Sequence, residues 1–582
     1  MIGTPQAPRE ESMLVGTSSL SSSVPLEEQG HLVRRHARVT FEKAAFLVLV
    51  LAAGWCWAVL ARWYSLPEHR SHTHFAFEKL PGGFASPILR GTLLLFLALA
   101  FAHVAGYVLL RRSRGDSPAI RLGVVALVVG PGIANVLVYP VGALDVFNYM
   151  VELKLAYHYD QNPYLATFAG YRDDPFALPA FLVDVPLFYG PAWLLASAVP
   201  GLLVGYDDFV ELLLALKVFN LALLVLTSLA IYRYQEDGKR GLLAAYLFLA
   251  NPLVLFEGVG NAHNDVLMTL FLVAALLALK RRSLTAAPLL ALSALVKFFT
   301  AALAPLFVLV ALAGKWRGRT LVSSALLSLA VVVVTTAPFW AGGQMMDGLA
   351  RGSVASQRMD HVSVVSLAQQ YVDQVRASKD GKPWLAALVR PHPRPQPLTD
   401  DEKRPMRRLF GGLFALFALL IAWTVKWGRE FEAAVVATLM LFALLLTNLY
   451  PWYLIPVFAV VALRRDRLGL AYLFAATALG LAYYPAYVYA HFNSGWVKFH
   501  AHVFLALFLT LPMVAFLALD VWRLGSKGKT EVGRTQGPAT GAPAVAASAA
   551  LDDGATVDRS TGAGQGTNGS MPQPNNTPTT AS

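Results

Sequence analysis

The chain has 582 residues, of which 56% are hydrophobic and only 14% are charged. Soluble domains carry about 25% charged residues, and many apolar runs here reach the ~20 residues that a helix needs to cross a bilayer. This composition excludes an ordinary soluble protein and predicts an all-α, polytopic membrane protein. The formal net charge of +12 is typical of basic cytoplasmic loops, so we expect no nucleic acid partner.

Missing motifs narrow the class of function further. Cys56 is the single cysteine, which excludes an internal disulfide and a zinc or iron–sulfur site built from cysteines. The sequence has no phosphate-binding GxxxxGK[ST] loop and no dinucleotide-binding GxGxxG after a strand. No soluble domain large enough to bind a nucleotide sugar remains outside the apolar runs. An enzyme of this design therefore takes its activated substrate from the membrane or from its outer face.

In chain order, residues 1–43 are polar and end in a basic cluster. They predict a disordered cytoplasmic tail rather than a cleaved signal peptide. The apolar runs that follow predict single spans at about 44–63, 89–110, 119–140, 209–233, 241–258, 264–280, 319–340, 468–489 and 499–522.

Paired short helices are predicted where basic residues flank both ends of an apolar stretch. One pair lies between Arg282 and Lys315 and breaks near Lys297. Two more spans frame the segment from Trp427 to Glu432, and the second of them forms another pair that breaks at residues 450–453. The total is roughly fourteen spans.

The spans form one transmembrane domain over residues 44–523, and residues 524–582 predict a second disordered cytoplasmic tail because they are small and polar. Large outer loops cover 141–208 and 341–406. Tyr189-Gly190-Pro191 opens a juxtamembrane helix in the first of these loops.

The segment 142–164 follows the third predicted span and contains the first outer carboxylate, Asp145. Read as a helix, it places Asp145, Asn148 and Glu152 on one face, since helical side chains return at such spacings. We expect this helix to lie along the membrane surface with its acidic face toward water or a substrate groove. Asn162-Pro163-Tyr164 ends it, because the residue before proline avoids the helical region.

Further polar residues emerge on the same predicted side of the membrane. They are His263, Asn264 and Asp265, the break at Lys297, and the group Tyr450, Trp452 and Tyr453. Charges at membrane depth are costly and usually face a cavity or a partner. Together with Asp145 they predict a single polar site roofed by the outer loops.

Each of these features also has a structural explanation. Asp145 could cap its helix, and Asn264 or Asp265 could cap the next span. Lys297 could extend to the lipid head groups, and the aromatic group could form an interfacial belt. Arg351 and Arg358 could clamp a phosphate or be solvated charges. Glu257 and Lys217 are interpreted as structural partners.

The motifs in this order resemble a known superfamily. Asp145 after an early span, Asn162-Pro163-Tyr164 and Tyr189-Gly190-Pro191 resemble the GT-C superfamily of integral-membrane glycosyltransferases. The bacterial polyprenol-phosphate-mannose-dependent α-(1→6)-mannopyranosyltransferase branch is resembled by Asn251-Pro252, Gly260 with His263-Asn264-Asp265, Lys297-Phe298 and Pro451-Trp452-Tyr453. The resemblance covers residues 120–300 and, more weakly, 430–460.

The resemblance implies a GT-C-like helical bundle that moves a hexose, mannose above all, from a polyprenyl-phosphate carrier to a glycan or glycolipid hydroxyl. It implies an inverting displacement with Asp145 as general base and Lys297, helped by His263 or an outer-loop arginine, beside the departing phosphate. The residues predicted to bind substrate are Asn148, Glu152, Asn162, Tyr164, Tyr189, His263, Asn264, Asp265, Lys297, Arg351, Arg358, Tyr450, Trp452 and Tyr453.

The expected setting is the bacterial inner membrane, with both termini cytoplasmic, membrane lipids around the spans and the active site on the outer, periplasmic face. No second acidic residue adjoins Asp145, so the sequence supports no cofactor and gives a divalent metal no paired-carboxylate site.

Two other functions use similar features. A transporter or flippase for a lipid-linked sugar would show inverted repeats and a pathway to both faces, and neither is recognised in the sequence. A glycan polymerase or ligase would centre on arginines of the late outer loop, such as Arg351 and Arg358, rather than on Asp145.

Overall fold

The structure is a computed structural model, and it describes residues 26–69, 86–113, 118–356, 431–446, 448–492 and 496–535, with isolated positions between 363 and 415. These residues form helices, and the isolated bridge between Ser65 and Val138 is the only strand-like pairing among them. The predicted all-α class is confirmed. The first 25 residues, most of the segment 357–430 that contains Arg358, and the residues after 535 lie outside the described residues.

The helices follow one another with short connections. The first half contains α1 (Leu26–Trp63), α2 (Leu66–His69), α3 (Pro87–Arg112), α4 (Pro118–Leu137), α5 (Asp145–Tyr157), α6 (Pro191–Val204), α7 (Phe209–Tyr234), α8 (Gly238–Leu249), α9 (Pro252–Leu255) and the π-helix η5 (Phe256–Gly260). The second half contains α10 (Asp265–Lys280), α11 (Ala286–Val296), the 3-10 helix η6 (Phe298–Leu303), α12 (Ala304–Ala313), α13 (Gly318–Thr336), α14 (Gln344–Ser356), α18 (Phe431–Leu445), the 3-10 turn η9 (Pro451–Tyr453), α19 (Leu454–Arg464), α20 (Arg467–Phe492) and α21 (Trp496–Thr535).

Six helices of the described residues are long and apolar enough to cross a membrane, or seven if α8 with its continuation to Gly260 counts as one bent span. Six further apolar helices have only 10–17 residues. At about 1.5 Å per residue, such helices do not reach across a hydrocarbon core of about 30 Å. The chain therefore has multiple membrane-spanning helices, but the predicted fourteen full spans are not confirmed.

Several predicted boundaries differ from the structure. Helix α1 begins at Leu26, inside the predicted first tail, and α21 continues to Thr535, inside the second. The segment predicted as one span at 241–258 is bent by 53°. The bend follows Asn251-Pro252, where proline has no N–H for the helix and the Asn251 side chain caps the next turn by accepting from the N–H groups of Leu253 and Val254.

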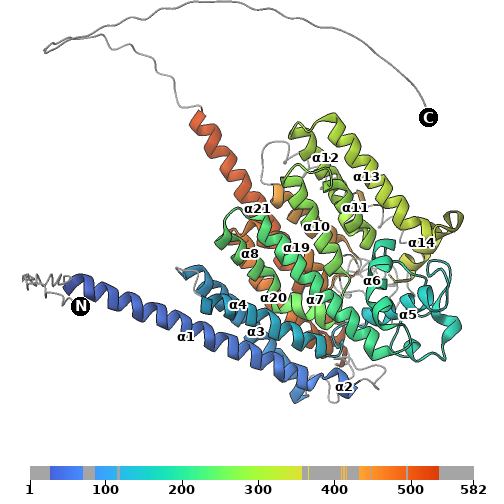
Figure 1. The fold of residues 1–582 in the computed structure, drawn as a ribbon, viewed down its shortest axis with the longest axis horizontal. Helices are drawn as coiled ribbons and strands as arrows, with labels where there is room; N and C mark the ends of the chain where they lie inside the picture. Colours follow the sequence, from blue (N-terminus) through green and yellow to red (C-terminus); the bar gives the residue numbers. More distant parts are fainter. Residues whose placement is uncertain are drawn as a thin grey trace, which may run out of the picture. The chain divides into compact units, whose positions relative to one another are not determined.

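Helix α10 is central to the described packing, because it contacts α7, α11 and α19. In Figure 1, α10, α11 and α13 run side by side, and α5, α6 and α14 gather near one end of these helices. Helix α5 packs against α6 and α7. This arrangement brings the start of α5 close to the ends of the broken helices.

Two side chains of α7 satisfy the carbonyl groups that the bend leaves outside regular helix. Lys217 is fully buried and donates to the carbonyls of Val138 and Gly260, the latter at 2.6 Å. Asn220 donates to the carbonyls of Gly258 and His263 at 2.9 and 3.1 Å. Polar backbone groups at membrane depth need such internal partners. The prediction that Lys217 is structural is consistent with these contacts.

Replacing this lysine should loosen the bend. In Lys217→Met the carbonyls of Val138 and Gly260 lose a buried donor, and each orphaned group costs about 1–3 kcal/mol. We expect a clear fall in the unfolding temperature in detergent. Lys280→Met is the control, because the Lys280 side chain is 40% exposed and should shift that temperature little; equal shifts for both variants would contradict this account.

Candidate active site

Asp145 is the first residue of α5, a position where the helix dipole favours a carboxylate. Its Oδ1 accepts a hydrogen bond of 3.1 Å from the Tyr189 hydroxyl, so the side chain is turned toward Tyr189. The ten residues from Val146 to Leu155 are all buried. The predicted surface helix is therefore wrong: α5 is packed on all faces, and it ends at Tyr157, before Asn162-Pro163-Tyr164.

Tyr189 reaches the site because Gly190 fits tightly against the end of α11. The Gly190 N–H donates to the carbonyl of Val296 at 3.1 Å. A Cβ atom at Gly190 would lie 1.9 Å from the carbonyl oxygen of Leu295, so no larger residue fits without moving backbone. This contact brings the Tyr189 ring to 5.9 Å from the Lys297 ammonium.

Lys297 lies in extended conformation between α11 and η6, as the predicted break required. Its Nζ donates to Oδ2 of Asp265 at 2.8 Å, and the Lys297 side chain is 15% exposed while that of Asp265 is fully buried. The same ammonium lies 4.6 Å from the centre of the Tyr453 ring. The lysine is thus a cation held by a buried carboxylate and by aromatic rings.

Three rings form a continuous stack next to this lysine. His263 stacks on Trp452 with ring centres 4.2 Å apart and an angle of 22°, and Trp452 stacks on Tyr450 at 4.4 Å and 14°. We call these three rings the platform. Its outer members, Tyr450 and Trp452, come from the residues around η9, and His263 comes from the loop between η5 and α10.

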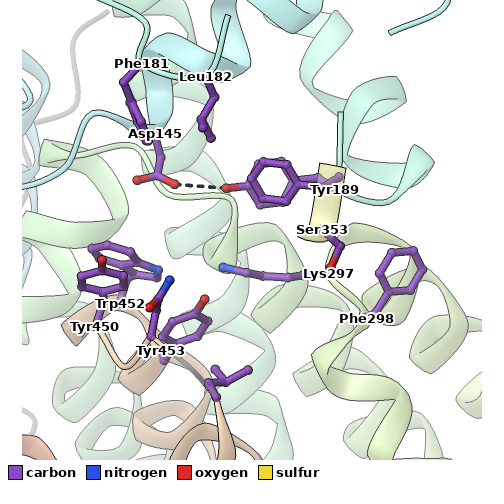
Figure 2. A pocket seen from close by; sticks show the side chains of 13 residues that line it. Asp145, Phe181, Leu182, Tyr189, Lys297, Phe298, Ser353, Tyr450, Trp452 and Tyr453 are labelled. Atoms are coloured by element: carbon purple, nitrogen blue, oxygen red, sulfur yellow. Dashed lines mark hydrogen bonds between the residues drawn. The ribbon is translucent and has the colours of Figure 1, made fainter. Parts of the chain in front are cut away.

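One cavity of about 250 Å³ joins these parts. Figure 2 shows the Asp145 carboxylate and the Lys297 ammonium on either side of this space, with Tyr450, Trp452 and Tyr453 along another wall. The residues that line it are Asp145, Phe181, Leu182, Phe188, Tyr189, Lys297, Phe298, Ser353, Leu446, Asn448, Tyr450, Trp452 and Tyr453. Six residues of the predicted site are therefore brought together: Asp145, Tyr189, Lys297, Tyr450, Trp452 and Tyr453.

Three predicted residues of the first outer loop do not line the cavity. Asn148 accepts with its Oδ1 from the N–H groups of Phe181 and Leu182 at 3.2 and 3.0 Å, and so holds a loop that does. Asn162 donates to the carbonyl of Phe339 at 2.9 Å, and the Tyr164 hydroxyl donates to the carbonyl of Tyr189 at 3.1 Å. These contacts hold the loop and leave the side chains no cavity surface.

Glu152 also lies away from the cavity lining. Burial raises the pKa of its carboxyl group, and the nearby charge of Asp145 raises it further. The predicted acidic face of α5 therefore contains one carboxylate that reaches the cavity, Asp145, and a second, Glu152, that burial keeps protonated.

His263, Asn264 and Asp265 form the layer behind the cavity, and all three are fully buried. Within the described residues, neither polar atom of the Asn264 side chain has a hydrogen-bond partner. Arg351 in α14 is exposed and does not line the cavity, and Arg358 lies outside the described residues. No group of three or more metal-ligating side chains is present among the residues described, and the absence of a cofactor stays a prediction.

Sequence reasoning missed several residues of the wall. Phe188, Phe298 and Asn448 are direct neighbours of recognised motifs and could have been found from that position. Phe181, Leu182, Ser353 and Leu446 carry no local signal, because packing of separate segments alone brings them to the cavity.

Comparisons with known proteins were made for the sequence and for the fold. No curated protein matches the sequence. Among solved structures, the Archaeoglobus fulgidus oligosaccharyltransferase in the apo form aligns with a TM-score of 0.33 and 15% identity, over 71% of this chain and 55% of that one. The chain thus spans about half of that enzyme's length, and the structural likeness is weak.

A family model gives the stronger finding. Residues 43–314 match the model described as Alpha-(1->6)-mannopyranosyltransferase, N-terminal domain. The matched region contains α3 to α11, and with them Asp145, Tyr189, His263, Asp265 and Lys297. This part of the chain is therefore similar to the N-terminal domain of the alpha-(1->6)-mannopyranosyltransferase family, as the sequence motifs predicted.

Proposed function

We propose that this protein is a glycosyltransferase that moves a hexose, mannose, from a polyprenyl-phosphate carrier to a hydroxyl group of a glycan or glycolipid. The observation that supports it most directly is the cavity of about 250 Å³ that the Asp145 carboxylate and the Lys297 ammonium both line. The family match over residues 43–314 favours mannose as the sugar. The proposed site lies at the outer face of a bacterial inner membrane, with both termini in the cytoplasm.

The proposed reaction is a single displacement. The acceptor hydroxyl gives its proton to Asp145 while its oxygen forms a bond to the anomeric carbon. The bond from that carbon to the phosphate oxygen breaks, and the polyprenyl phosphate leaves with the electron pair. Attack opposite to the leaving group inverts the anomeric configuration. A positioned general base of this kind contributes typically 10²–10⁴-fold to the rate.

The Lys297 ammonium is suited to the leaving group. Negative charge increases on the phosphate as the bond breaks, and a fixed cation in a dry site stabilises such charge strongly. Asp265 holds the lysine at 2.8 Å from the far side of the cavity wall, which keeps Lys297 in place before the donor binds. Tyr189 bonds Asp145 at 3.1 Å and orients the base in the same way.

The remaining lining fits a sugar ring. Tyr450 and Trp452 present aromatic surface to the cavity, and flat aromatic side chains bind the apolar faces of sugars. Pockets for small molecules usually measure about 300–1,000 Å³. A cavity near the lower limit favours a single sugar over an oligosaccharide donor, which argues against a polymerase or ligase. Arg351 supports that alternative no further, since it is exposed and outside the cavity.

The first test is transfer by Asp145→Asn. With radiolabelled polyprenyl-phospho-mannose as donor and a short α-mannoside as acceptor, membranes with the wild type should transfer the label. Asp145→Asn should reduce transfer at least about 10²-fold because the base is lost. Asp184→Asn is the matched control: it is a carboxylate of the same outer loop, 63% exposed and paired with Arg172, and should retain full transfer.

The outcomes separate the candidates. Transfer that survives in a folded Asp145→Asn protein would place the base elsewhere. If the wild type transfers no mannose, other lipid-linked sugars are tested in the same assay, and movement of the lipid-linked sugar across vesicles is then the test for a flippase.

A second test separates the catalytic role of Lys297 from its structural role. Lys297→Met alone leaves the fully buried Asp265 without its cation, and breaking a buried pair costs about 3–5 kcal/mol. This variant should lose both stability and transfer. The double variant Lys297→Met with Asp265→Asn removes both charges, so it should recover most of the unfolding temperature but no transfer. Recovery of transfer in the double variant would contradict the phosphate role.

A further inference from the structure

A third carboxylate, Glu257, lies close to the proposed site but does not line the cavity. It belongs to the π-helical turn η5 and is fully buried. π-helical turns are rare and occur frequently at functional sites, and a buried carboxylate is expensive unless it is well bonded. Its contacts therefore indicate what it holds in place.

Glu257 is contacted by three side chains. Its Oε1 accepts a hydrogen bond of 2.5 Å from the Tyr484 hydroxyl of α20. Its Oε2 accepts from the Asn261 side-chain amide at 2.9 Å and lies 3.4 Å from Nε2 of His263. The carboxylate thus joins helix α20 to both ends of the short loop between η5 and α10.

One of these contacts leads to the platform. The His263 ring that faces Glu257 is the buried end of the stack with Trp452 and Tyr450, at 4.2 and 4.4 Å. A ring in a stack can slide or tilt with little resistance unless one member is fixed. Glu257 is the charged group that contacts His263 among the described residues, so it fixes the end of the stack farthest from the cavity.

The second contact leads to Asp145. The Asn261 amide that donates to Glu257 also accepts, through its Oδ1, a hydrogen bond of 3.1 Å from the N–H of Gly142. A Cβ atom at Gly142 would lie 2.7 Å from the Asn261 amide nitrogen, so glycine permits this close approach. Gly142 stands just before α5, and its position sets where that helix and its first residue, Asp145, begin.

The loop that connects both contacts is strained. Ala262, between Asn261 and His263, has φ of +56° and is buried. A non-glycine residue in this region costs about 1–3 kcal/mol and persists when surrounding contacts enforce it. The bonds of Asn261 and His263 to one carboxylate supply such contacts.

We propose that Glu257 is a positioning residue that sets both the tilt of the platform and the start of α5. The inference rests on the proposed function, since it assigns Glu257 to the geometry of that same site. Glu257 aligns the sugar-facing rings and the base with each other through His263 and Asn261, without touching the substrate.

The test uses Glu257→Gln, which keeps the shape and one acceptor but removes the charge. We expect kcat to fall about 10–100-fold, since a displacement of about 1 Å at a reacting group can cost 10²-fold, while KM for the donor changes less. Tyr484→Phe removes one donor to the same carboxylate and should give a smaller fall in kcat. It also serves if Glu257→Gln does not fold.

The matched control is Thr477→Val. The Thr477 hydroxyl contacts the Asn251 amide at 2.7 Å, a buried bond between α20 and the N-terminus of α9 that does not lead to the platform. This variant should lower the unfolding temperature about as much as Glu257→Gln, with kcat retained. Equal losses of kcat and stability in both variants would show a merely structural role and overturn the proposal.

A readout without substrate tests the positioning separately from the activity. The near-ultraviolet circular dichroism of Trp452 is obtained as the difference between the chain with and without Trp452→Phe. This signal should shrink in Glu257→Gln and persist in Thr477→Val. An unchanged Trp452 signal in Glu257→Gln would overturn the proposal even if kcat falls. If the wild type transfers no sugar, the proposed function fails, while the Trp452 signal still decides the role of Glu257.

Discussion

The ion pair between Lys297 and Asp265 is the interaction on which the rest of the site depends. Lys297 stands where α11 ends, and Asp265 stands where α10 begins. Each charge would be unstable alone at this depth, and each is acceptable because the other is 2.8 Å away. The pair fixes two helix ends together, and Tyr189 and Tyr453 then pack around its ammonium.

Broken helices make such a site possible in a protein that is otherwise apolar. A helix that stops inside the bundle exposes carbonyl and N–H groups that lipid cannot satisfy. Lys217, Asn220 and Asn251 bond the groups released around the bend of α8 and η5. The polar residues of the chain are therefore used in two layers. One layer satisfies the backbone at the breaks, and the other faces the cavity.

The sequence was sufficient to predict the breaks and much of the cavity wall. Charges and aromatic residues inside apolar runs, such as Lys297 and Trp452, are rare enough to be informative, and their common side followed from the basic flanks. It was not sufficient for α5, which was predicted to lie on the surface because Asn148 and Glu152 share a face with Asp145. Their burial depends on the 181–188 loop folding over them, a contact between distant segments that periodicity does not encode.

Glu257 was interpreted as structural for a similar reason. Nothing in its neighbourhood in the sequence reveals that Tyr484, more than two hundred residues later, bonds its carboxylate. The number of spans was overestimated because hydropathy measures the length of an apolar run. It does not distinguish a crossing from two half-length helices that meet inside the bundle.

The shortness of the helices around the site has a consequence for the lipid. Helix α11 has 11 residues and so measures about 16 Å, roughly half the thickness of a hydrocarbon core. A bilayer next to such helices must become thinner, or the helix ends must remain below the level of the head groups. In either case the distance between a lipid phosphate and the Lys297 ammonium is shortened. A long-chain donor could then present its sugar without lifting its tail out of its own leaflet.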